Sequence, residues 1–279
     1  MPKVSVIIPT YNCGEYLDES ISSVLGQTYR DLELIVVDNG SDDDSDRVVG
    51  RHAGDQRLIY VKKATKNVSR ARNFGISSAN GELLAFLDAD DMFFKDKISR
   101  QVDLFEKNPR CGLSYTNEVY FKKGEAGESL STYYHFSGDI FYYLKRNNFI
   151  HTSTVMGRKS IFLENMFDET LNGHEDWELF LRIARKGIRF LYLDEPLSKV
   201  RLREKSVTRN KSLMDATRRE VGLRARGYWR DFKKEARPFS LRGQEAMLRY
   251  LKFKAYAFLL GFPKKRCFNM PIPQETPQR

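Results

Sequence analysis

The segment from Leu83 to Asp91 carries the densest group of chemically useful side chains in the sequence. The apolar run 83–87 predicts a buried strand, and Asp88, Asp90 and Asp91 follow it directly. Carboxylates this close together repel one another, so we expect a cation beside them. Oxygen ligands suit Mg²⁺ or Mn²⁺, which bind one or two carboxylates together with waters and phosphate oxygens. The alternative is an acidic turn in which Asp90 or Asp91 caps the next helix.

A second acidic pair, Glu175 and Asp176, begins a predicted helix that ends near Lys186. Leu179 and Ile183 lie on its apolar face, so packing should hold the first turn rigidly. The helix macrodipole favours carboxylates at this end, which is a purely structural explanation. The chemical explanation is a general base directed at the site.

Histidine and cysteine patterns point away from zinc sites and disulfide frameworks. The four histidines have no metal-ligand spacing, and we interpret each as structural or exposed: His52, His135, His151 and His174. The three cysteines are scattered, which fits a reducing cytoplasm. The N-terminus enters a strand pattern at once, so we expect no signal peptide, and no apolar run is long enough to cross a bilayer.

The net charge of +10 over 279 residues is concentrated near the C-terminus. Residues 201–266 hold 20 Lys and Arg against 6 Asp and Glu, whereas the remainder holds 27 against 31. Apolar residues recur at helical spacing between 247 and 259, which predicts a basic amphipathic helix that contacts an anionic membrane surface. The alternative is a helix that covers the catalytic domain. Nucleic acid is not expected, because the segment lacks a zinc-finger or RNA-binding signature.

Strands and helices alternate in the first half, which predicts an α/β fold with a mostly parallel, doubly wound sheet. Strands are expected at 4–8, 32–37, 58–61, 83–87 and 112–121, and helices at 15–27, 45–52, 68–79 and 95–108. Beyond a mobile loop at 122–134 we expect helices at 138–147, 159–165 and 175–186, and short strands at 189–193 and 197–202.

Ligands of such sheets bind at the carboxyl ends of the strands. Residues 10–12, 38–39 and 88–91 follow three of these strands and should therefore form one site. Arg70 and Arg72 are two positions apart on a helix, so at most one of them should face it. The chain has neither the glycine fingerprint of dinucleotide-binding enzymes nor a P-loop.

The sequence resembles the family 2 glycosyltransferases, inverting enzymes with the GT-A fold. Six segments in the family's order and spacing carry the resemblance: 6–12 (VIIPTYN), 36–41 (VVDNGS), 71–75 (ARNFG), 86–91 (FLDADD), 167–169 (FDE) and 175–177 (EDW). Such enzymes move a sugar from a nucleotide-diphospho-sugar to an acceptor hydroxyl. The resemblance implies a metal-dependent transferase of the hexosyltransferase type, using Mn²⁺ or Mg²⁺, in bacterial surface polysaccharide assembly.

The resemblance also implies roles for individual residues. Asp176 is the catalytic base, with Glu175 beside it, and Asp91 holds the metal, with Asp90 nearby. The donor nucleotide is expected to contact Pro9, Thr10, Tyr11, Asn12, Asp38, Asn39, Arg72, Asp88, Asp90 and Arg203.

Two departures from the family pattern affect these roles. Asn39 stands where many members have Asp, and an amide still suits uracil or thymine, so UDP is the expected donor nucleotide and TDP the alternative. Arg203 stands where many members have a histidine, and it is expected to bind the diphosphate.

The expected organisation is a GT-A catalytic domain followed by a helical extension. The catalytic domain spans 1–210, with a nucleotide-binding half at 1–110 and an acceptor half at 111–210. A basic helical extension at 211–262 and a disordered tail at 263–279 follow. The acceptor would be a saccharide or a lipid-linked saccharide, and the location cytoplasmic, peripheral on the inner face of the membrane. The alternative function is a catalytically inactive partner subunit that binds sugar nucleotides.

Overall fold

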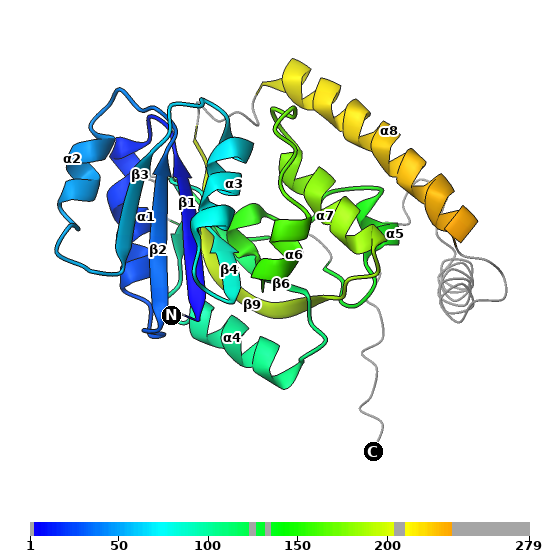
Figure 1. The fold of residues 1–279 in the computed structure, drawn as a ribbon, viewed down its shortest axis with the longest axis horizontal. Coiled ribbons are helices and arrows are strands. Elements are labelled where there is room, and N and C mark those ends of the chain that lie inside the picture. Colours follow the sequence, from blue (N-terminus) through cyan, green and yellow to red (C-terminus); the bar gives the residue numbers. More distant parts are fainter. Residues whose placement is uncertain (1–2, 123–126, 132–134, 204–209, 236–279) are drawn as a thin grey trace.

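The computed structural model describes residues 3–122, 127–131, 135–203 and 210–235 (Figure 1). The strands are β1 Val4–Thr10, β2 Leu32–Asp38, β3 Leu58–Lys62, β4 Leu83–Phe86, β5 Met92–Phe93, β6 Leu113–Phe121, β7 Glu128–Leu130, β8 Met156–Arg158 and β9 Phe190–Arg201. The helices are α1 Gly14–Leu25, α2 Ser45–Gly50, α3 Val68–Ser78, α4 Lys97–Lys107, α5 Phe141–Leu144, α6 Lys159–Glu164, α7 Glu175–Arg185 and α8 Lys211–Glu235, with a 3₁₀ turn, η1, at Thr152–Thr154.

The strands form one sheet in the order β3-β2-β1-β4-β8-β6-β9-β5, and β7 pairs with β6. The four strands β3, β2, β1 and β4 are parallel to their neighbours, as the alternation of strands and helices predicted. In the second half, β8 is antiparallel to both β4 and β6, and β6 is parallel to β9. The α/β fold is therefore confirmed, with a parallel first half and a mixed second half.

Alternating side chains of the central strands face two separate apolar layers. Val6 and Ile8 of β1 pack toward α1, α2 and α4, whereas Ile7 packs toward α3 and the helices of the second half. Both faces of β1 and β2 are buried, which explains why most of their residues are apolar. Figure 1 shows α1, α2 and α3 around the parallel strands. The packing fixes the strand ends that carry the polar residues.

Several element boundaries differ from the prediction for local reasons. β1 continues past Pro9, which pairs with Val37, and ends at Thr10. The two short strands expected at 189–193 and 197–202 are one strand, β9, with a shift in register against Thr116 and Asn117 of β6. The helix expected at 138–147 spans only α5, and β7 lies inside the expected loop at 122–134, whose residues 123–126 and 132–134 are outside the described chain.

The long helix α8 lies against α7 on the outside of the second half (Figure 1). Val221 and Ala225 of α8 are buried. The predicted continuation of the helical extension to residue 262, its amphipathic stretch at 247–259 and the tail at 263–279 lie outside the described residues. Among the described helices, none has the length and apolar character that a membrane crossing would need.

Candidate active site

The polar ends of β1, β2 and β4 lie at one edge of the sheet, as their parallel arrangement requires. Thr10 pairs with Asp38 across β1 and β2, and the Asn39 amide donates to the Thr10 carbonyl at 2.8 Å. β4 lies on the other side of β1, and the Leu87 amide donates to the Ile7 carbonyl at 3.0 Å. The segment Asp88–Asp91 therefore leaves the sheet beside the end of β1.

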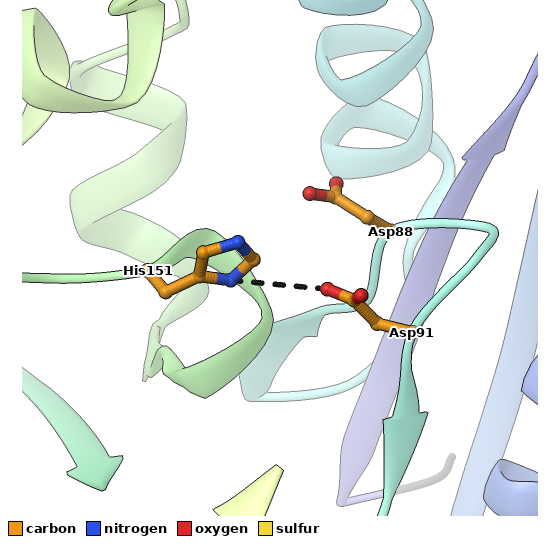
Figure 2. A group of neighbouring side chains, drawn as sticks. All are labelled: Asp88, Asp91 and His151. Atoms are coloured by element: carbon orange, nitrogen blue, oxygen red, sulfur yellow. Dashed lines mark ion pairs between the residues drawn. The ribbon is translucent and has the colours of Figure 1, made fainter. Parts of the chain in front are cut away.

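Asp88, Asp91 and His151 form the centre of this edge (Figure 2). Their ligand atoms all lie within 4.8 Å of one another, and His151 Nδ1 is 3.8 Å from Asp91 Oδ2. The two carboxylates suit Mn²⁺ or Mg²⁺ and lie close enough to share one cation, and the imidazole favours a transition metal such as Mn²⁺ over Mg²⁺. The interpretation of His151 as a lone histidine is thus wrong. Its two acidic neighbours precede it by at least 60 residues in the sequence, so no short motif connects them.

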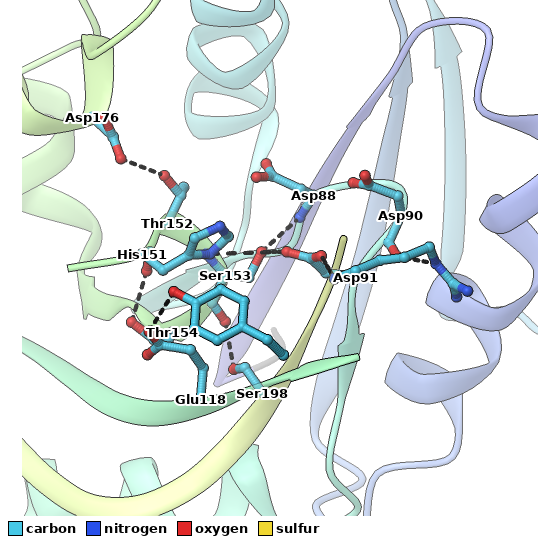
Figure 3. Close-up of polar contacts among 12 residues, drawn as sticks. Asp88, Asp90, Asp91, Glu118, His151, Thr152, Ser153, Thr154, Asp176 and Ser198 are labelled. Carbon is cyan, nitrogen blue, oxygen red and sulfur yellow. Dashed lines mark hydrogen bonds and ion pairs between the residues drawn. The ribbon is translucent and has the colours of Figure 1, made fainter. Parts of the chain in front are cut away.

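The carboxylate of Asp91 is held from two sides (Figure 3). Ser153 Oγ donates to Asp91 Oδ2 at 2.6 Å, and the Arg201 amide donates to Oδ1 at 2.9 Å. Burial raises the pKa of Asp91 to about 7, with His151 opposing the shift and the neighbouring carboxylates of Asp90 and Asp88 adding to it. A cation at this position would relieve the same repulsion.

Arg72 connects the group of Asp88, Asp91 and His151 with the acidic pair at the start of α7. Its guanidinium is buried and pairs with Asp88 Oδ1 at 2.8 Å and with Glu175 Oε1 at 2.7 Å. Burial would raise the pKa of Asp88, but the charge and hydrogen bond of Arg72, together with the charges of His151 and Arg203, outweigh burial and lower the pKa. Arg70 instead pairs with Glu169 at 3.0 Å on the surface. Only one of the two arginines faces the site, as predicted.

Asp176 lies on the opposite side of His151 from the sheet edge. Its Oδ2 accepts hydrogen bonds from Asn148 Nδ2 at 3.1 Å and from Thr152 Oγ1 at 3.3 Å. Burial, assisted by the charge of Glu175, raises the pKa of Asp176 to about 6. A carboxylate with such a pKa is ionised at neutral pH and still basic enough to accept a proton from a hydroxyl in a transition state.

The first turn of α7 is fixed by its surroundings. The Trp177 indole donates to the Leu144 carbonyl at 2.6 Å, and Leu179 and Phe180 are fully buried. His174, the residue before the helix, has a left-handed φ of 55° and bonds Thr217 of α8 through Nδ1 at 2.9 Å. Helix α8 therefore contributes to placing the acidic pair.

Asp90 makes a contact of a different kind. Its Oδ2 pairs with Arg203 Nε at 2.5 Å, and the Arg203 guanidinium lies over the Tyr16 ring at 5.4 Å. Burial and the charge of Asp88 raise the pKa of Asp90, against the lowering effect of Arg203. Asp90 could therefore bind a metal ion only if part of this ion pair were lost. Arg203 lies beside the same edge, where its positive charge could bind an anionic group.

The loop after β2 is organised by Asp38. Its Oδ1 accepts from the Gly40 and Ser41 amides at 3.0 and 2.8 Å, and its Oδ2 accepts from the Tyr60 hydroxyl at 2.7 Å. With three donors on one buried carboxylate, Asp38 shapes the loop. Asn39 Oδ1 accepts from the Thr65 hydroxyl.

The loop after β1 presents three side chains in different environments. Thr10 is buried, and its hydroxyl has no hydrogen-bond partner among the described residues. Tyr11 is 42% exposed, and Asn12 takes a left-handed φ of 50° that lets its Oδ1 accept from the Asp42 amide at 2.9 Å. Pro9 is buried within β1. The predicted donor-site residues thus surround one edge, although Pro9 and Asp38 are largely occupied with the fold.

Several site residues could not be found from the sequence. They belong to the segment 148–153 of the second half: Asn148, His151, Thr152 and Ser153. A short polar run between apolar residues was their only sequence signal, and many surface loops share it.

Comparison with known proteins identifies a matching family and related folds. The profile of Glycosyl transferase family 2 matches residues 5–171. An uncharacterized glycosyltransferase of Rickettsia felis is 37% identical over 223 residues, which cover 79% of this chain and 36% of that protein. TuaG of Bacillus subtilis, named as a glycosyltransferase of teichuronic acid biosynthesis, is 30% identical, and the match covers 75% of this chain and 83% of TuaG. The match thus spans about a third of the length of the relatives from Rickettsia felis, Rickettsia conorii and Rickettsia bellii.

Two solved structures share the fold. Staphylococcus aureus TarS in complex with UDP-GlcNAc superimposes with a TM-score of 0.64 at 18% identity, over 94% of this chain and 77% of that one. The mannosyltransferase PcManGT of Pyrobaculum calidifontis, in complex with GDP-Man and Mn²⁺, gives a TM-score of 0.58 at 19% identity, over 92% and 81% of the two chains. Both are GT-A enzymes, so the expected fold class is confirmed.

Proposed function

Because the chain belongs to glycosyl transferase family 2, we propose that it transfers a sugar from a nucleotide-diphospho-sugar to an acceptor hydroxyl with inversion at the anomeric carbon. One observation carries the proposal. In the view of Figure 3, the base candidate Asp176 and the metal-binding candidates Asp88 and Asp91 lie on either side of His151, and Arg72 pairs with both Asp88 and Glu175. A displacement with inversion needs a base on one face of the sugar and a stabilised leaving group on the other.

The proposed reaction uses Asp176 as the general base. Its carboxylate takes the proton of the acceptor hydroxyl while the acceptor oxygen forms a bond to the anomeric carbon. The bond from that carbon to the diphosphate oxygen breaks, and the electron pair leaves with the nucleoside diphosphate. Thr152 and Asn148 orient Asp176 during this step, and Arg203 offers a positive charge to the diphosphate.

A divalent cation fits the donor set at this edge. Asp91, Asp88 and His151 would hold Mn²⁺ or Mg²⁺, with Asp90 available beside them. When bound, the ion supplies Lewis-acid stabilisation of the departing diphosphate. Binding would also remove the mutual repulsion of the carboxylates.

We propose UDP as the nucleotide of the donor and TDP as the alternative. The side-chain amide of Asn39, near Thr10, Tyr11 and Asn12, is proposed to bind the nucleobase. Asp38 holds the loop in place by accepting hydrogen bonds from the Gly40 and Ser41 amides. The transferred group is proposed to be a hexose. UDP-GlcNAc in TarS and GDP-Man in PcManGT support a nucleotide sugar as the ligand class.

The proposed acceptor is a saccharide or a lipid-linked saccharide. The name of the relative TuaG supports a setting in bacterial surface polysaccharide assembly. We propose that the protein acts in the cytoplasm, peripheral to the membrane, with a catalytic domain at 1–210 and a basic extension at 211–262.

Thermal shift with UDP, TDP, GDP and CDP, each with and without Mn²⁺, tests the nucleotide and the metal together. We expect UDP with Mn²⁺ to stabilise the protein most. Release of nucleoside diphosphate from a panel of nucleotide sugars, in the presence of saccharide acceptors, then tests transfer. Nucleotide binding without transfer to any acceptor would instead favour the inactive, sugar-nucleotide-binding partner subunit.

A further inference from the structure

The four consecutive residues His151–Thr154 touch both functional sides of the candidate site. Thr152–Thr154 form η1, and His151 precedes it, with Nδ1 accepting from the Ser153 amide at 3.2 Å. In a 3₁₀ turn successive side chains point about a third of a turn apart. Neighbouring residues of this segment can therefore reach different partners, which Figure 3 shows for Thr152 and Ser153.

Ser153 serves the metal side. Its hydroxyl donates to Asp91 Oδ2 at 2.6 Å and accepts from the Asp88 amide at 3.1 Å. The side chain is fully buried. One hydroxyl thus fixes both the direction of the Asp91 carboxylate and the backbone turn that begins at Asp88.

Thr152 serves the base side. Its hydroxyl is 3.3 Å from Asp176 Oδ2, where it donates beside the Asn148 amide. Thr152 is 3% exposed, so water does not easily replace it. Hydrogen bonds to an ionised carboxylate are stronger than neutral ones and orient it more firmly.

The segment is itself anchored from elements outside the site. Ser198 Oγ of β9 donates to the Ser153 carbonyl at 2.8 Å. Lys97 and Gln101 of α4 donate to the Thr154 carbonyl at 3.3 and 3.2 Å. With supports from two elements, the segment forms a rigid spacer between the two halves of the site.

We propose that His151–Thr154 sets the distance and orientation between the base and the metal-binding carboxylates, with Ser153 as the positioning residue of Asp91 and Thr152 as the positioning residue of Asp176. The inference rests on the proposed function. It predicts that adjacent hydroxyls affect different steps: Ser153 acts on metal binding and Thr152 on turnover. A segment with only a general structural role would affect both steps from either position.

The test compares Ser153→Ala with Thr152→Val. We expect Ser153→Ala to weaken Mn²⁺ binding about 10-fold, the usual effect of losing a bond that orients a metal ligand. The electron paramagnetic resonance signal of free Mn²⁺ measures this binding. Thr152→Val should leave the Kd values for Mn²⁺ and UDP within about twofold of those of the wild-type protein. It should lower kcat about 10-fold with little change in the KM for the donor. Thr152→Ser, which keeps the hydroxyl, should restore turnover.

Two buried hydroxyls elsewhere provide matched controls. Ser5 donates to the Glu33 carboxylate at 2.5 Å and accepts from the Gly81 amide at 2.8 Å, the same pattern as Ser153. Thr116 is fully buried and donates to the Asn117 carbonyl at 3.0 Å. Ser5→Ala and Thr116→Val should cost stability without changing Mn²⁺ affinity or kcat.

The inference is overturned if Ser153→Ala binds Mn²⁺ as Ser5→Ala does, or if Thr152→Val weakens Mn²⁺ binding as much as Ser153→Ala. Normal turnover of Thr152→Val would also overturn it. A wild-type protein that transfers no sugar would refute the proposed function separately. The Mn²⁺ comparison of Ser153→Ala with Ser5→Ala needs no donor and would still decide the metal half of the inference.

Discussion

At the scale of single residues, some members of the candidate site can be identified from the sequence pattern and others cannot. Asp88, Asp90 and Asp91 follow a strand and could be assigned to a binding edge from the pattern alone. His151 could not, because its neighbours in space come from another part of the chain and no short motif links them. A metal site made from distant segments leaves no spacing signal.

Asp176 is expected to act in the chemical step more than in donor binding. Asp176→Asn keeps the size of the side chain but removes its negative charge and one of its two accepting oxygens. We expect turnover to fall by roughly 10²–10⁴, the usual contribution of a general base, and the Kd for UDP to change little. Steady-state kinetics and calorimetric titration measure the two effects, and near-normal turnover would remove Asp176 from the mechanism.

The pH dependence of kcat/KM should report the ionisation of Asp176. Burial raises the pKa of Asp176 to about 6, so the carboxylate is ionised above that pH and protonated below it. Only the ionised form can accept a proton, so kcat/KM should fall about tenfold per pH unit below about 6 and level off above it. Circular dichroism at each pH checks that the fold persists. A profile that stays flat to pH 5 in folded protein would contradict the assignment.

Asp91 is expected to be required for metal-enhanced nucleotide binding. Asp91→Asn keeps the shape of the side chain but removes its negative charge beside Asp88 and His151. The extra thermal stabilisation that Mn²⁺ gives in the presence of UDP should disappear. Asp55→Asn, which changes a carboxylate paired with Arg57 away from this edge, should leave the extra stabilisation intact. If both variants keep it, Asp91 is not a ligand.

At the scale of elements, long periodic segments were predicted well and short ones were not. Helix α3 lies at 68–78 against a predicted 68–79, and the Asn67 side chain caps it by accepting from the Arg70 amide. In contrast, β5, β8 and η1 have two or three residues each. Segments this short carry no detectable period, since they form only where neighbouring strands offer hydrogen-bond partners.

Helix α8 is expected to hold the base helix through its buried face. Arg224 pairs with Asp168 at 2.5 Å, the Tyr228 hydroxyl donates to Glu178 at 2.8 Å, and Val221 is fully buried. Val221→Asp would bury an unpaired charge, so we expect about 2 kcal/mol or more of lost stability and faster hydrogen exchange in α8.

The same helix supplies the control for this prediction. Leu223 is 61% exposed, and Leu223→Asp should change stability by less than about 0.5 kcal/mol. Urea denaturation and hydrogen exchange compare the two variants. Equal behaviour of Val221→Asp and Leu223→Asp would show that the contact between α8 and α7 contributes little.

At the scale of the whole molecule, the parallel first half was predictable because a physical rule places its strand ends together. No comparable rule places the second half. The position of Asp176 beside His151 depends on how β8 pairs with β4 and β6, a pairing between segments about 70 and 40 residues apart. The gathering of the polar strand ends at one edge was therefore predictable from the residues. The pair Glu175 and Asp176 could be picked out as a candidate base, but its place beside His151 could not be predicted.

The C-terminal charge leads to a prediction about the whole protein. Residues 236–266 hold eight Lys or Arg and one Glu, interleaved with apolar residues at helical spacing between 247 and 259. Such a segment is expected to bind anionic lipid, where each basic residue contributes about 1 kcal/mol at low salt. A lipid-linked acceptor is confined to that surface, so binding would bring the enzyme to its substrate.

Vesicle flotation measures this association. The full chain should float with phosphatidylglycerol-containing vesicles at low salt, less at high salt, and not with neutral vesicles. The matched control is a chain that ends at Glu235, because a cut before α8 would also remove the buried Val221 and Ala225 and expose the apolar surface that they cover. The shortened chain should remain at the bottom of the gradient. If both chains float equally, the folded part carries the association, and if neither floats, the basic segment has another role.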